Sequence, residues 1–372
     1  MTIQAIIFAG SEARRLRPLS YAIPKPLAPV CNISVLERLI SQLTAAGFDA
    51  ADIIFPVLSS DALQTITNYT SPGFRLSINQ RTNLQQGCVA ATRSVLHKDA
   101  KQVLIIYGDS LLKADIKGLL CCHQENQSKG ALATILYHKP PDFLTPEREG
   151  RTYHGAIRMD STNRITYFKE KPLVEEIIST TDVANAAVFV CERSLLEGGE
   201  FFNAKDYSFD VFEPLASHAS ASPLFAYGIG NGFRRDLGTV ERLFDANMDV
   251  LSKRLDLPIP GSELFPNCWI EKNAEINNSQ IHPSTLIGEN VYLGLGTEIG
   301  PNVVIGRGSV IGDNSIIKNS LIMEHVTIGE GSRLDYCVVG AHSEIGHCQN
   351  LPRYTILGRH CSVGALTWMV PS

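Results

Sequence analysis

The sequence predicts an α/β domain with a mainly parallel sheet, followed by a parallel β-helix. Two observations support this fold class. Up to about residue 250, short apolar runs alternate with helical patterns, which is typical of an α/β domain. After residue 261, an apolar residue stands at every sixth position, which is the sequence mark of a parallel β-helix. We therefore expect domains at residues 1–254 and 267–372, joined by a linker at residues 255–266.

The first domain begins with QAIIFA at residues 4–9, an apolar run that predicts a buried strand. The segment VLERLISQLTAAG, residues 35–47, has apolar residues at helical spacing and ends in glycine, so it predicts a helix. Four further apolar runs predict buried strands: ADIIFPVL (51–58), QVLIIYG (102–108), ALATILYH (131–138) and AAVFVC (186–191). Strands that alternate with helices in this way favour a parallel sheet.

The second domain is predicted from its six-residue period. The period runs through Ile281, Ile287, Leu293, Ile299, Ile305, Ile311 and Ile317. It continues in a shifted register at Ile322, Ile328 and Leu334, and in a third register at Val339, Ile345, Leu351, Leu357 and Val363. We expect each of these side chains to point inward, so that stacked coils bury a continuous apolar column. The preceding segment, LDLPIPGSELFP, contains prolines and predicts the linker.

The composition is that of an ordinary globular protein, with 372 residues, 44% hydrophobic residues and a net charge of −5. The negative charge argues against general nucleic-acid binding, and no apolar run approaches the roughly 20 residues of a membrane span. The start, MTIQAIIFAG, lacks the basic and long apolar regions of a signal peptide. The nine cysteines are scattered without a CxxC pair, which argues against a zinc site and favours a reducing compartment. We therefore expect a cytoplasmic protein.

Residues 6–30, IIFAGSEARRLRPLSYAIPKPLAPV, have the order of a phosphate-binding turn: an apolar strand, a glycine and a basic loop. Gly10 is present, but Ser11, Glu12 and Ala13 follow where such a loop usually has more glycine. A positive φ at one of these positions costs roughly 1 kcal/mol without glycine. We expect this cost to weaken nucleotide binding about tenfold without abolishing it.

Five motifs occur in the order in which they occur in the sugar-1-phosphate nucleotidylyltransferases, and the chain resembles that family over nearly its whole length. The motifs are AGSEARRLRPL with PKPLAPV, YGDSLL (107–112), HGAIRMD with ITYFKEKP (154–172), ANAAVFV (184–190) and GFRRDLGT (232–239). These enzymes join a sugar 1-phosphate to an NTP and release pyrophosphate. With its β-helix, the chain is most similar to the mannose-1-phosphate guanylyltransferases. The resemblance implies a Rossmann-like nucleotidyltransferase domain followed by a left-handed β-helix.

The resemblance implies that four charged residues carry the reaction. Both reactants are anions, so neutralising and positioning their phosphates supplies most of the catalysis. Asp109 and Asp236 are expected to hold Mg²⁺, which prefers one or two carboxylates and keeps several waters. Arg15 is expected over the β- and γ-phosphates, because its planar fork grips phosphate oxygens in pairs. Lys25 is expected to reach the α-phosphate or the sugar phosphate.

The resemblance also implies which residues bind each substrate. Those expected at the nucleotide are Ala9, Gly10, Ser11, Glu12, Ala13, Arg14, Gln80, Gln85 and Gly87. Those expected at the sugar are Gly155, Glu170, Lys171 and Asn185. In this second set the carboxylate accepts sugar hydroxyls and the lysine pairs with the sugar phosphate. Two further positions depart from the family, since Cys88 stands at the place of a threonine and Arg234 stands where the family often has tryptophan.

The charged residues of the motifs are all present, so we predict an active enzyme of nucleotide-sugar biosynthesis. GTP and mannose 1-phosphate are the best guess for its substrates, with a related sugar or a sugar-like cyclitol phosphate as a variant. One alternative is a catalytically weakened regulatory or scaffold subunit, because the glycine-rich loop is altered. Another is a bifunctional enzyme whose β-helix transfers an acyl group. Its base would be one of five histidines, more simply interpreted as exposed turn residues: His282, His325, His342, His347 and His360.

The expected partners are the two substrates and further copies of the chain. The resemblance implies a homodimer or homotetramer, because the β-helix commonly mediates assembly in this family. The apolar segment LTWMV at residues 366–370 would suit such an interface.

Overall fold

The computed structural model describes residues 2–9, 13–55, 63, 66, 73–80, 87–146, 149–197, 199–218 and 221–364. The chain divides into two units. Unit 1 comprises residues 1–11 and 38–235, and unit 2 comprises residues 12–37 and 236–372. Unit 2 therefore joins a segment from near the N-terminus to the C-terminal part of the chain. The apolar segment 366–370 lies outside the described residues.

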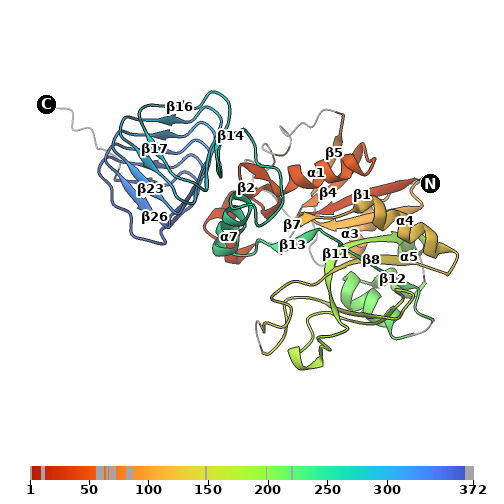
Figure 1. The fold of residues 1–372 in the computed structure, drawn as a ribbon. Helices are drawn as coiled ribbons and strands as arrows, with labels where there is room; N and C mark the ends of the chain where they lie inside the picture. The colour runs from red at the N-terminus through yellow and green to blue at the C-terminus, as the bar shows by residue number, and fades with distance from the viewer. Residues whose placement is uncertain are drawn as a thin grey trace. The chain divides into compact units, whose positions relative to one another are not determined.

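One half of the sheet in unit 1 is parallel. β1 (Ile3–Phe8) lies between β4 (Ala50–Phe55) and β6 (Gln102–Tyr107), and β5 (Arg75–Gln80) pairs with the other edge of β4 (Figure 1). All four strands run in the same direction, which confirms the predicted parallel sheet here. β1, β4 and β6 are buried almost throughout, as expected of apolar strands covered on both faces. Residues 56–58 of one predicted strand lie outside the described residues.

The other half of the sheet is mixed. β11 (Val183–Glu192) runs antiparallel to β6, β8 (Ala133–His138) and β9 (Ala156–Met159), whereas β12 (Leu224–Gly228) runs parallel to β8. β9 also pairs antiparallel with β10 (Ile165–Lys169) across a short turn. Such a turn permits only an antiparallel pair, because a parallel pair needs a crossover of about a dozen residues. The expected parallel arrangement therefore does not extend over this half.

Helices connect these strands. α1 (Val35–Ala45) confirms the predicted helix. In the part of unit 1 that the structure describes, the further helices are α3 (Gly87–Val95), α4 (Ile116–Gln127), α5 (Ser194–Glu197) and α6 (Glu213–Ala216). Among the helices of the described residues, none is long and apolar enough to cross a membrane.

Short elements connect the motif residues. β2 (Pro29–Val30) and β3 (Ile33–Ser34) form a hairpin, and the 3-10 turns η1 (Arg14–Leu16), η2 (Leu19–Tyr21) and η3 (Lys25–Leu27) precede it. β7 (Ser110–Lys113) follows β6 and pairs with β13 (Phe233–Asp236). The chain then enters α7 (Val240–Leu251), which begins after the capping residue Thr239.

Residues 262–363, which we call the C-terminal stack, consist of short strands in three sheets (Figure 1). Sheet 1 contains β14 (Ser262–Phe265), β15 (Cys268–Ile270), β18 (Thr285–Ile287), β21 (Val303–Ile305), β24 (Ser320–Ile322), β27 (Val338–Val339) and β29 (Ile356–Leu357). Sheet 2 contains β16 (Glu275–Ile276), β19 (Tyr292–Leu293), β22 (Val310–Ile311), β25 (Thr327–Ile328), β28 (Glu344–Ile345) and β30 (Ser362–Val363). Sheet 3 contains β17 (Gln280–Ile281), β20 (Glu298–Ile299), β23 (Ile316–Lys318) and β26 (Arg333–Asp335). Except for the β14–β15 pair, which is antiparallel, these pairs are parallel, which is consistent with the predicted β-helix.

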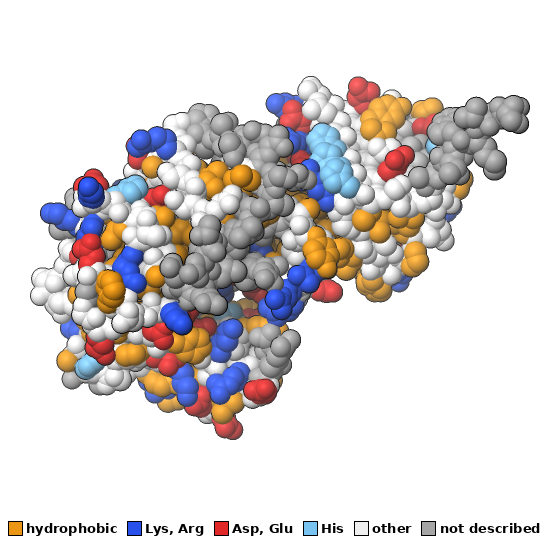
Figure 2. Space-filling model, turned by 180° about the vertical axis from the view of Figure 1, so that it is seen from behind, with side chains coloured by type: hydrophobic (Ala, Val, Ile, Leu, Met, Phe, Trp, Pro, Cys, Tyr) orange, Lys and Arg blue, Asp and Glu red, His pale blue; other side chains and the backbone are white. Residues whose placement is uncertain are grey.

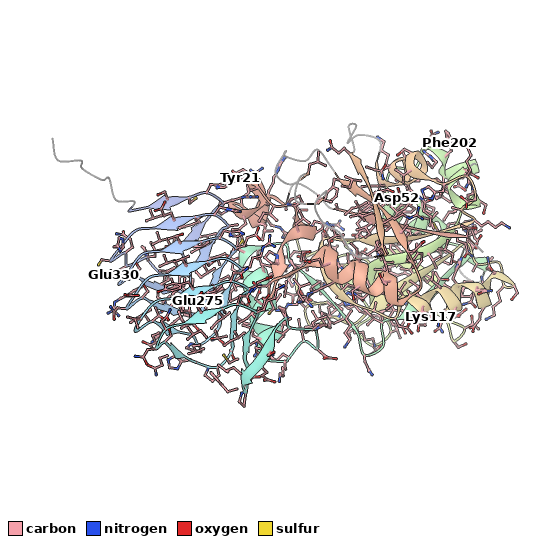
Figure 3. The ribbon with its side chains drawn as sticks, turned by 90° about the horizontal axis from the view of Figure 1, so that it is seen from above. Tyr21, Asp52, Lys117, Phe202, Glu275 and Glu330 are labelled. Carbon is pink, nitrogen blue, oxygen red and sulfur yellow. The ribbon has the colours of Figure 1, made fainter. Side chains whose placement is uncertain are left out.

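The six-residue period corresponds to the inner column of the stack. The interior cluster contains the predicted positions from Ile287 to Leu351, most of them fully buried. Strand partners lie one coil apart, so Thr285 pairs with Val303 and Val303 pairs with Ser320. The second of these coils is one residue shorter than the first, and this explains the shifted register that begins at Ile322. Outside the column, the labelled side chains of Glu275 and Glu330 lie on the surface (Figure 3).

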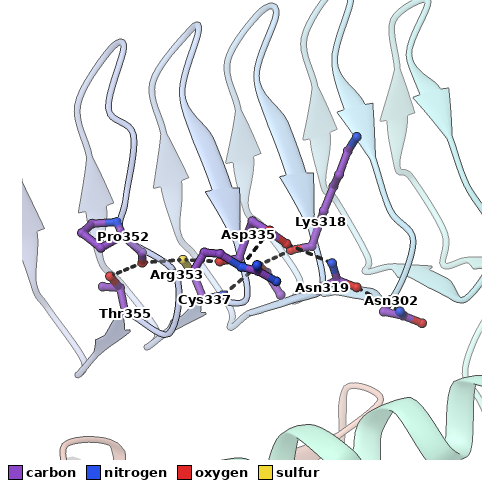
Figure 4. Close-up of polar contacts among 9 residues, drawn as sticks. Asn302, Lys318, Asn319, Asp335, Cys337, Pro352, Arg353 and Thr355 are labelled. Carbon is purple, nitrogen blue, oxygen red and sulfur yellow. Dashed lines mark hydrogen bonds and ion pairs between the residues drawn. The ribbon is translucent and has the colours of Figure 1, made fainter.

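The turns between strands use left-handed backbone, which asparagine tolerates better than most residues. Asn302 and Asn319 occupy equivalent turns of successive coils, with φ values of 59° and 45°. Their side chains form a ladder (Figure 4): the Asn302 amide donates to Asn319 at 3.0 Å, and the Asn319 amide donates to Asp335 at 2.9 Å. Arg353 of the next coil pairs with Asp335 at 3.1 Å. The four coils that carry these residues are thus joined in sequence at one corner.

We expect Ile311→Ala to lower the free energy of unfolding by about 2–5 kcal/mol, because Ile311 is fully buried in the column and its truncation leaves a cavity. The neighbouring Val310→Ala is the matched control, since Val310 belongs to the same strand and is 41% exposed. Denaturant unfolding of the two variants measures the difference. Equal losses in both would contradict the inward assignment of Ile311.

Candidate active site

The structure brings predicted site residues together in two groups, one in each unit. In unit 2, the Lys25 ammonium lies 3.8 Å from a carboxylate oxygen of Asp236. Lys25 begins η3 and is only 6% exposed, whereas Asp236 ends β13. A buried charge is costly unless it is paired. The ion pair therefore accounts for a lysine in this position.

Arg242 is a further member of this group that the sequence analysis did not identify. Its guanidinium pairs with the second carboxylate oxygen of Asp236. Arg242 lies in the first turn of α7, where its amide donates to the Thr239 hydroxyl at 3.2 Å. A cation in the first turn opposes the helix dipole, so it indicates an anionic partner. That conflict of charge is the sequence signal by which Arg242 could have been found.

Arg15 lies beside the same carboxylate. A Cβ built on Gly238 would stand 2.7 Å from Oδ2 of Asp236 and 3.3 Å from a guanidinium nitrogen of Arg15. A glycine at residue 238 therefore lets both groups approach the backbone. Arg14 and Arg15 are exposed in η1. Unit 2 thus gathers three cations, those of Arg15, Lys25 and Arg242, near one aspartate.

The turn that carries Arg15 begins at a strained residue. Ala13 has φ 45° and ψ 43°, in the left-handed region. Its carbonyl accepts hydrogen bonds from the Leu16 amide at 2.9 Å and from the Ser20 hydroxyl at 2.8 Å. Alanine in this conformation costs roughly 1 kcal/mol relative to glycine. The positive φ that the sequence analysis considered for this loop is therefore present at Ala13.

The start of the loop is only partly described. Ala9 is buried directly after β1, and its amide donates to the Ile54 carbonyl at 2.9 Å. Gly10, Ser11 and Glu12 lie outside the described residues.

In unit 1, the predicted sugar-binding residues Gly155, Glu170 and Asn185 lie together. A Cβ built on Gly155 would stand 2.6 Å from Oε2 of Glu170 and 3.4 Å from the Asn185 Cβ. The Asn185 amide donates to the Gly155 carbonyl at 2.8 Å. The absence of a side chain at Gly155 therefore leaves space for the Glu170 carboxylate, which a Cβ at this position would displace.

The surroundings of the half-buried Glu170 act on its carboxyl group in opposite directions. Burial raises the pKa of Glu170 above its usual value, while the Ser208 hydroxyl and then the Lys171 ammonium oppose that shift. The Glu170 amide donates to a carboxylate oxygen of Glu213 at 2.7 Å. Lys171 is exposed and has φ 47°, a conformation that lysine rarely adopts. The Glu170 carboxylate can accept hydroxyl groups from a ligand, and the Lys171 ammonium can pair with an anion.

Asn185 lies at an irregularity in β11. Pairing with β8 shifts register between Asn185 and Phe189, and Ala187 within this bulge has φ 56°. Oδ1 of Asn185 accepts a hydrogen bond from the Ala187 amide at 2.9 Å. The side chain thus holds the bulge through its oxygen. Its Nδ2 donates to no described residue and is available to a ligand.

The remaining predicted residues of unit 1 lie at strand and helix ends. Asp109 stands between β6 and β7 and accepts a hydrogen bond from the Ser110 hydroxyl at 3.2 Å. Gln80 is exposed at the end of β5. Gly87 begins α3 with φ 74°, and a Cβ there would overlap the Lys205 carbonyl at 2.2 Å. Gln85 lies outside the described residues.

Cys88, which departs from the family pattern, has a partner that the sequence analysis did not assign. The Tyr107 hydroxyl donates to its Sγ at 3.2 Å. Burial raises the pKa of the Cys88 thiol and, more strongly, the pKa of the Tyr107 phenol. Both groups therefore stay protonated at neutral pH, and Cys88 is not an activated nucleophile.

Arg234, the other departure, acts on a pair of buried histidines. The rings of His138 and His154 meet edge to face with centroids 5.6 Å apart, and Nε2 of His154 lies 3.4 Å from Oδ1 of Asp142. Burial, followed by the charges of Arg234 and His154, lowers the pKa of His138 from 6.5 to about 3. Nε2 of His138 has no hydrogen-bond partner among the described residues. His138 is therefore neutral at physiological pH.

The five histidines of the C-terminal stack lie at its surface. The rings of His325, His342 and His360 stack with centroids 5.0 and 5.2 Å apart, and Figure 2 shows histidine side chains grouped on this part of the protein. His347 is exposed, and His282 lies 3.3 Å from Oε1 of Glu298. None of the five is buried. Across the residues that the structure describes, no three His, Cys, Asp or Glu side chains form a ready metal cluster.

Two family models match the chain. The model for nucleotidyl transferase matches residues 4–253, and the model for the GMPPB C-terminal domain matches residues 264–369. Together they cover the α/β part and the C-terminal stack.

Curated relatives extend over most of the chain. The UTP–glucose-1-phosphate uridylyltransferase of Synechocystis sp. is 26% identical over 91% of this chain and 88% of its own length. The mannose-1-phosphate guanyltransferase of Hypocrea jecorina is 25% identical over 97% of this chain and 93% of its own length. Glucose-1-phosphate adenylyltransferase 2 of Vibrio cholerae is 27% identical over 70% of this chain and 65% of its own length. The names of these relatives share the sugar 1-phosphate and differ in nucleotide and sugar.

We expect His138 to make the protein less stable in mild acid. Its pKa is near 6.5 unfolded and about 3 folded, so the unfolded state binds more protons between these values. The free energy of unfolding should fall as pH drops from about 6.5 towards 3, by up to about 1.4 kcal/mol per pH unit. Denaturant unfolding from pH 7 to pH 4 measures this slope.

The matched variants are His138→Gln and His347→Gln, since His347 is exposed on the stack. His138→Gln should flatten the slope, and His347→Gln should leave it unchanged. An unchanged slope in His138→Gln would show that other groups set the acid sensitivity.

Proposed function

This chain belongs to the nucleotidyl transferase family and is an enzyme of the nucleotidyltransferase class, and we propose that it transfers a nucleoside monophosphate from an NTP to a sugar 1-phosphate. The products are a nucleoside diphosphate sugar and pyrophosphate. The observation that carries this proposal is the pairing of Lys25 with Asp236, with Arg15 and Arg242 beside it. Such a cluster of cations around one carboxylate suits phosphate groups and a divalent ion.

We propose GTP and mannose 1-phosphate, or a related sugar-like or cyclitol phosphate, as the substrates. The match to the GMPPB C-terminal domain supports this choice, as do relatives named for mannose-1-phosphate guanylyl transfer. Other relatives are named for uridylyl and adenylyl transfer to glucose 1-phosphate. A nucleotide screen is therefore the direct test.

The reaction would proceed by displacement at the α-phosphorus of the NTP. A phosphate oxygen of the sugar 1-phosphate forms the new bond to this phosphorus, and the bond to the β-phosphate oxygen breaks, so pyrophosphate leaves with its electron pair. Lys25 neutralises the α-phosphate or the sugar phosphate as they approach, and Arg15 holds the β- and γ-phosphates. Neutralisation and alignment supply the catalysis, because the two anions otherwise repel each other.

Asp109 and Asp236 have the donor chemistry for Mg²⁺. Mg²⁺ binds hard oxygen ligands and is held by one or two carboxylates together with waters and substrate phosphates. The Asp236 side chain is partly exposed at 24%, so one carboxylate oxygen can exchange its cationic partner for an ion. Bound Mg²⁺ would supply additional positive charge to the phosphates.

Glu170, Asn185 and Gly155 form the proposed sugar site. The half-buried carboxylate of Glu170 accepts sugar hydroxyls, Nδ2 of Asn185 donates to another, and Gly155 allows the ring to approach the backbone. The Lys171 ammonium pairs with the sugar phosphate. The left-handed Ala13 favours a second candidate, a catalytically weakened regulatory or scaffold subunit, because its strain lies in the phosphate loop.

We further propose that residues 1–254 form the nucleotidyltransferase domain and residues 267–372 a left-handed β-helix, joined by residues 255–266. The six-residue period and the three sheets of the stack support the β-helix. A homodimer or homotetramer located in the cytoplasm is part of the same proposal.

The first test is pyrophosphate release with Mg²⁺, pairing each of five NTPs with mannose, glucose and related 1-phosphates. We expect turnover with one pair, highest with GTP, and a loss of at least a hundredfold in Asp109→Ala. Asp99→Ala, at an exposed position before β6, is the control and should retain wild-type activity. If folded wild-type protein releases no pyrophosphate with any pair, loss of NTP binding in calorimetry would favour the weakened subunit. Retained NTP binding would indicate a sugar outside the panel.

A second test separates the sugar site from the nucleotide site. Gly155→Ala should raise KM for the sugar 1-phosphate about tenfold or more and leave KM for the NTP within about twofold. The added methyl would stand 2.6 Å from the Glu170 carboxylate and displace it. Glu170→Gln keeps the side-chain shape and should raise the same KM. An effect confined to the NTP would refute the sugar assignment.

A further inference from the structure

Sheet 1 of the C-terminal stack has an outer face that is covered. Its side chains at alternate positions include Leu286, Val304, Leu321 and Val338, which are at most 5% exposed although they lie outside the interior cluster. Solvent therefore hardly reaches the middle of this face. The covering chain belongs to the same unit, since Lys253 lies 5.4 Å from the Trp269 ring and the Phe244 and Tyr336 rings are 6.3 Å apart.

The β2–β3 hairpin is one attachment point on this sheet. Its turn residues Cys31 and Asn32 have φ values of 48° and 58°, as in a type I′ turn. The Asn32 side-chain amide donates to the Ile305 carbonyl at 3.0 Å and to a carboxylate oxygen of Glu271 at 2.9 Å. The Cys31 amide donates to the side chain of Asn247 in α7 at 2.7 Å. The turn is thus bonded to two coils of the stack and to one helix.

Pro18 is a second attachment point. A Cβ built on Gly358 would stand 3.3 Å from the Pro18 Cβ, so the backbone of this coil lies directly against the proline. The segment from Pro18 to Asn32 is therefore held at both ends by the stack. Lys25 lies between the two points, buried and paired with Asp236.

The local structure around Lys25 is weak by itself. η3 is a single 3-10 turn, closed by hydrogen bonds from the Leu27 amide to the Pro24 carbonyl and from the Ala28 amide to the Lys25 carbonyl. One such turn does not hold a side chain to the sub-ångström tolerance that phosphoryl transfer requires. External attachment must supply that precision.

We propose that the C-terminal stack positions Lys25 for the reaction. Asn32 is the positioning residue, because its hydrogen bonds to the stack hold the segment that contains Lys25. The role of Lys25 in the reaction rests on the proposed function, whereas its attachment to the stack does not. Asn32 acts through the backbone of the Pro18–Asn32 segment and touches no reacting atom. The stack is then part of the catalytic apparatus as a template, in addition to any role in assembly.

Asn32→Gly tests this directly, because glycine keeps the left-handed φ and removes only the amide. We expect kcat to fall about tenfold, since a displacement on the order of 1 Å can cost more than that. KM for the sugar 1-phosphate should change less than twofold. In a Lys25→Ala background, Asn32→Gly should cause no further loss, because the side chain that it positions is gone.

The matched control is Asn277→Gly. Nδ2 of Asn277 also donates to a carbonyl in the stack, that of Leu293 at 3.0 Å, at a turn between sheets 2 and 3. Its kcat should remain near the wild-type value. Glu271→Ala removes an Asn32 acceptor without altering the segment itself and should lower kcat in the same direction, by about threefold. An equal loss of kcat in Asn277→Gly would overturn the proposal. So would a full loss of kcat from Asn32→Gly in the Lys25→Ala background.

Hydrogen exchange gives a readout that does not require turnover. In Asn32→Gly the amides of Leu27 and Ala28 should exchange at least tenfold faster, while those of the stack column stay protected. Wild-type protein with neither turnover nor NTP binding would refute the proposed function, and faster exchange in the variant would still support attachment of the segment. Unchanged exchange would refute the attachment whatever the activity.

Discussion

The carboxylate of Asp236 is the interaction on which the arrangement of unit 2 depends. It pairs with Lys25 from the N-terminal segment and with Arg242 from the first turn of α7. Neither cation is well placed alone, since one is buried and the other opposes a helix dipole. One anion therefore compensates two unfavourable positions and joins three stretches of chain. A site built in this way has its charges in place before a phosphate arrives, so little reorganisation is needed on binding.

Backbone strain occurs within the same motifs as well as in the turns of the C-terminal stack. Ala13, Lys171 and Ala187 all have positive φ, and each lies within or beside a stretch that resembles the family. Two of them are alanines, which bear this conformation at a cost of roughly 1 kcal/mol each. Such strain persists only where the surrounding structure determines the backbone. At Ala13 the Ser20 hydroxyl helps to do so, and at Ala187 the Asn185 side chain does.

The parts of the structure that could be predicted are those that produce a local pattern in the sequence. The apolar runs predicted β1, β4, β6, β8 and β11, and the six-residue period predicted the interior column, because both depend on neighbours close in sequence. The antiparallel half of the sheet was not predicted, since strand direction depends on how β9 and β10 turn back. The contacts of Asn32 with Ile305 and Glu271 join residues more than two hundred positions apart, and no periodicity encodes them. The motif residues were identified, but Arg242 and Tyr107 were not. Their partners, Asp236 and Cys88, lie six and nineteen positions away, and neither pairing follows a helical or strand period.

The two attachment points on the stack lie at different coils. The stack therefore fixes the distance between the two ends of the Pro18–Asn32 segment. Ile305, Ile322, Val339 and Leu357 are successive partners in sheet 1, so three coil steps separate the point beside Asn32 from the coil of Gly358. Neighbouring strands are about 4.8 Å apart, which sets the span at roughly 14 Å. Coils can be gained or lost as whole units at the ends of such an array over evolutionary time. Between these two points their number is constrained, because a change of one coil would alter the span across which the Lys25 segment is stretched.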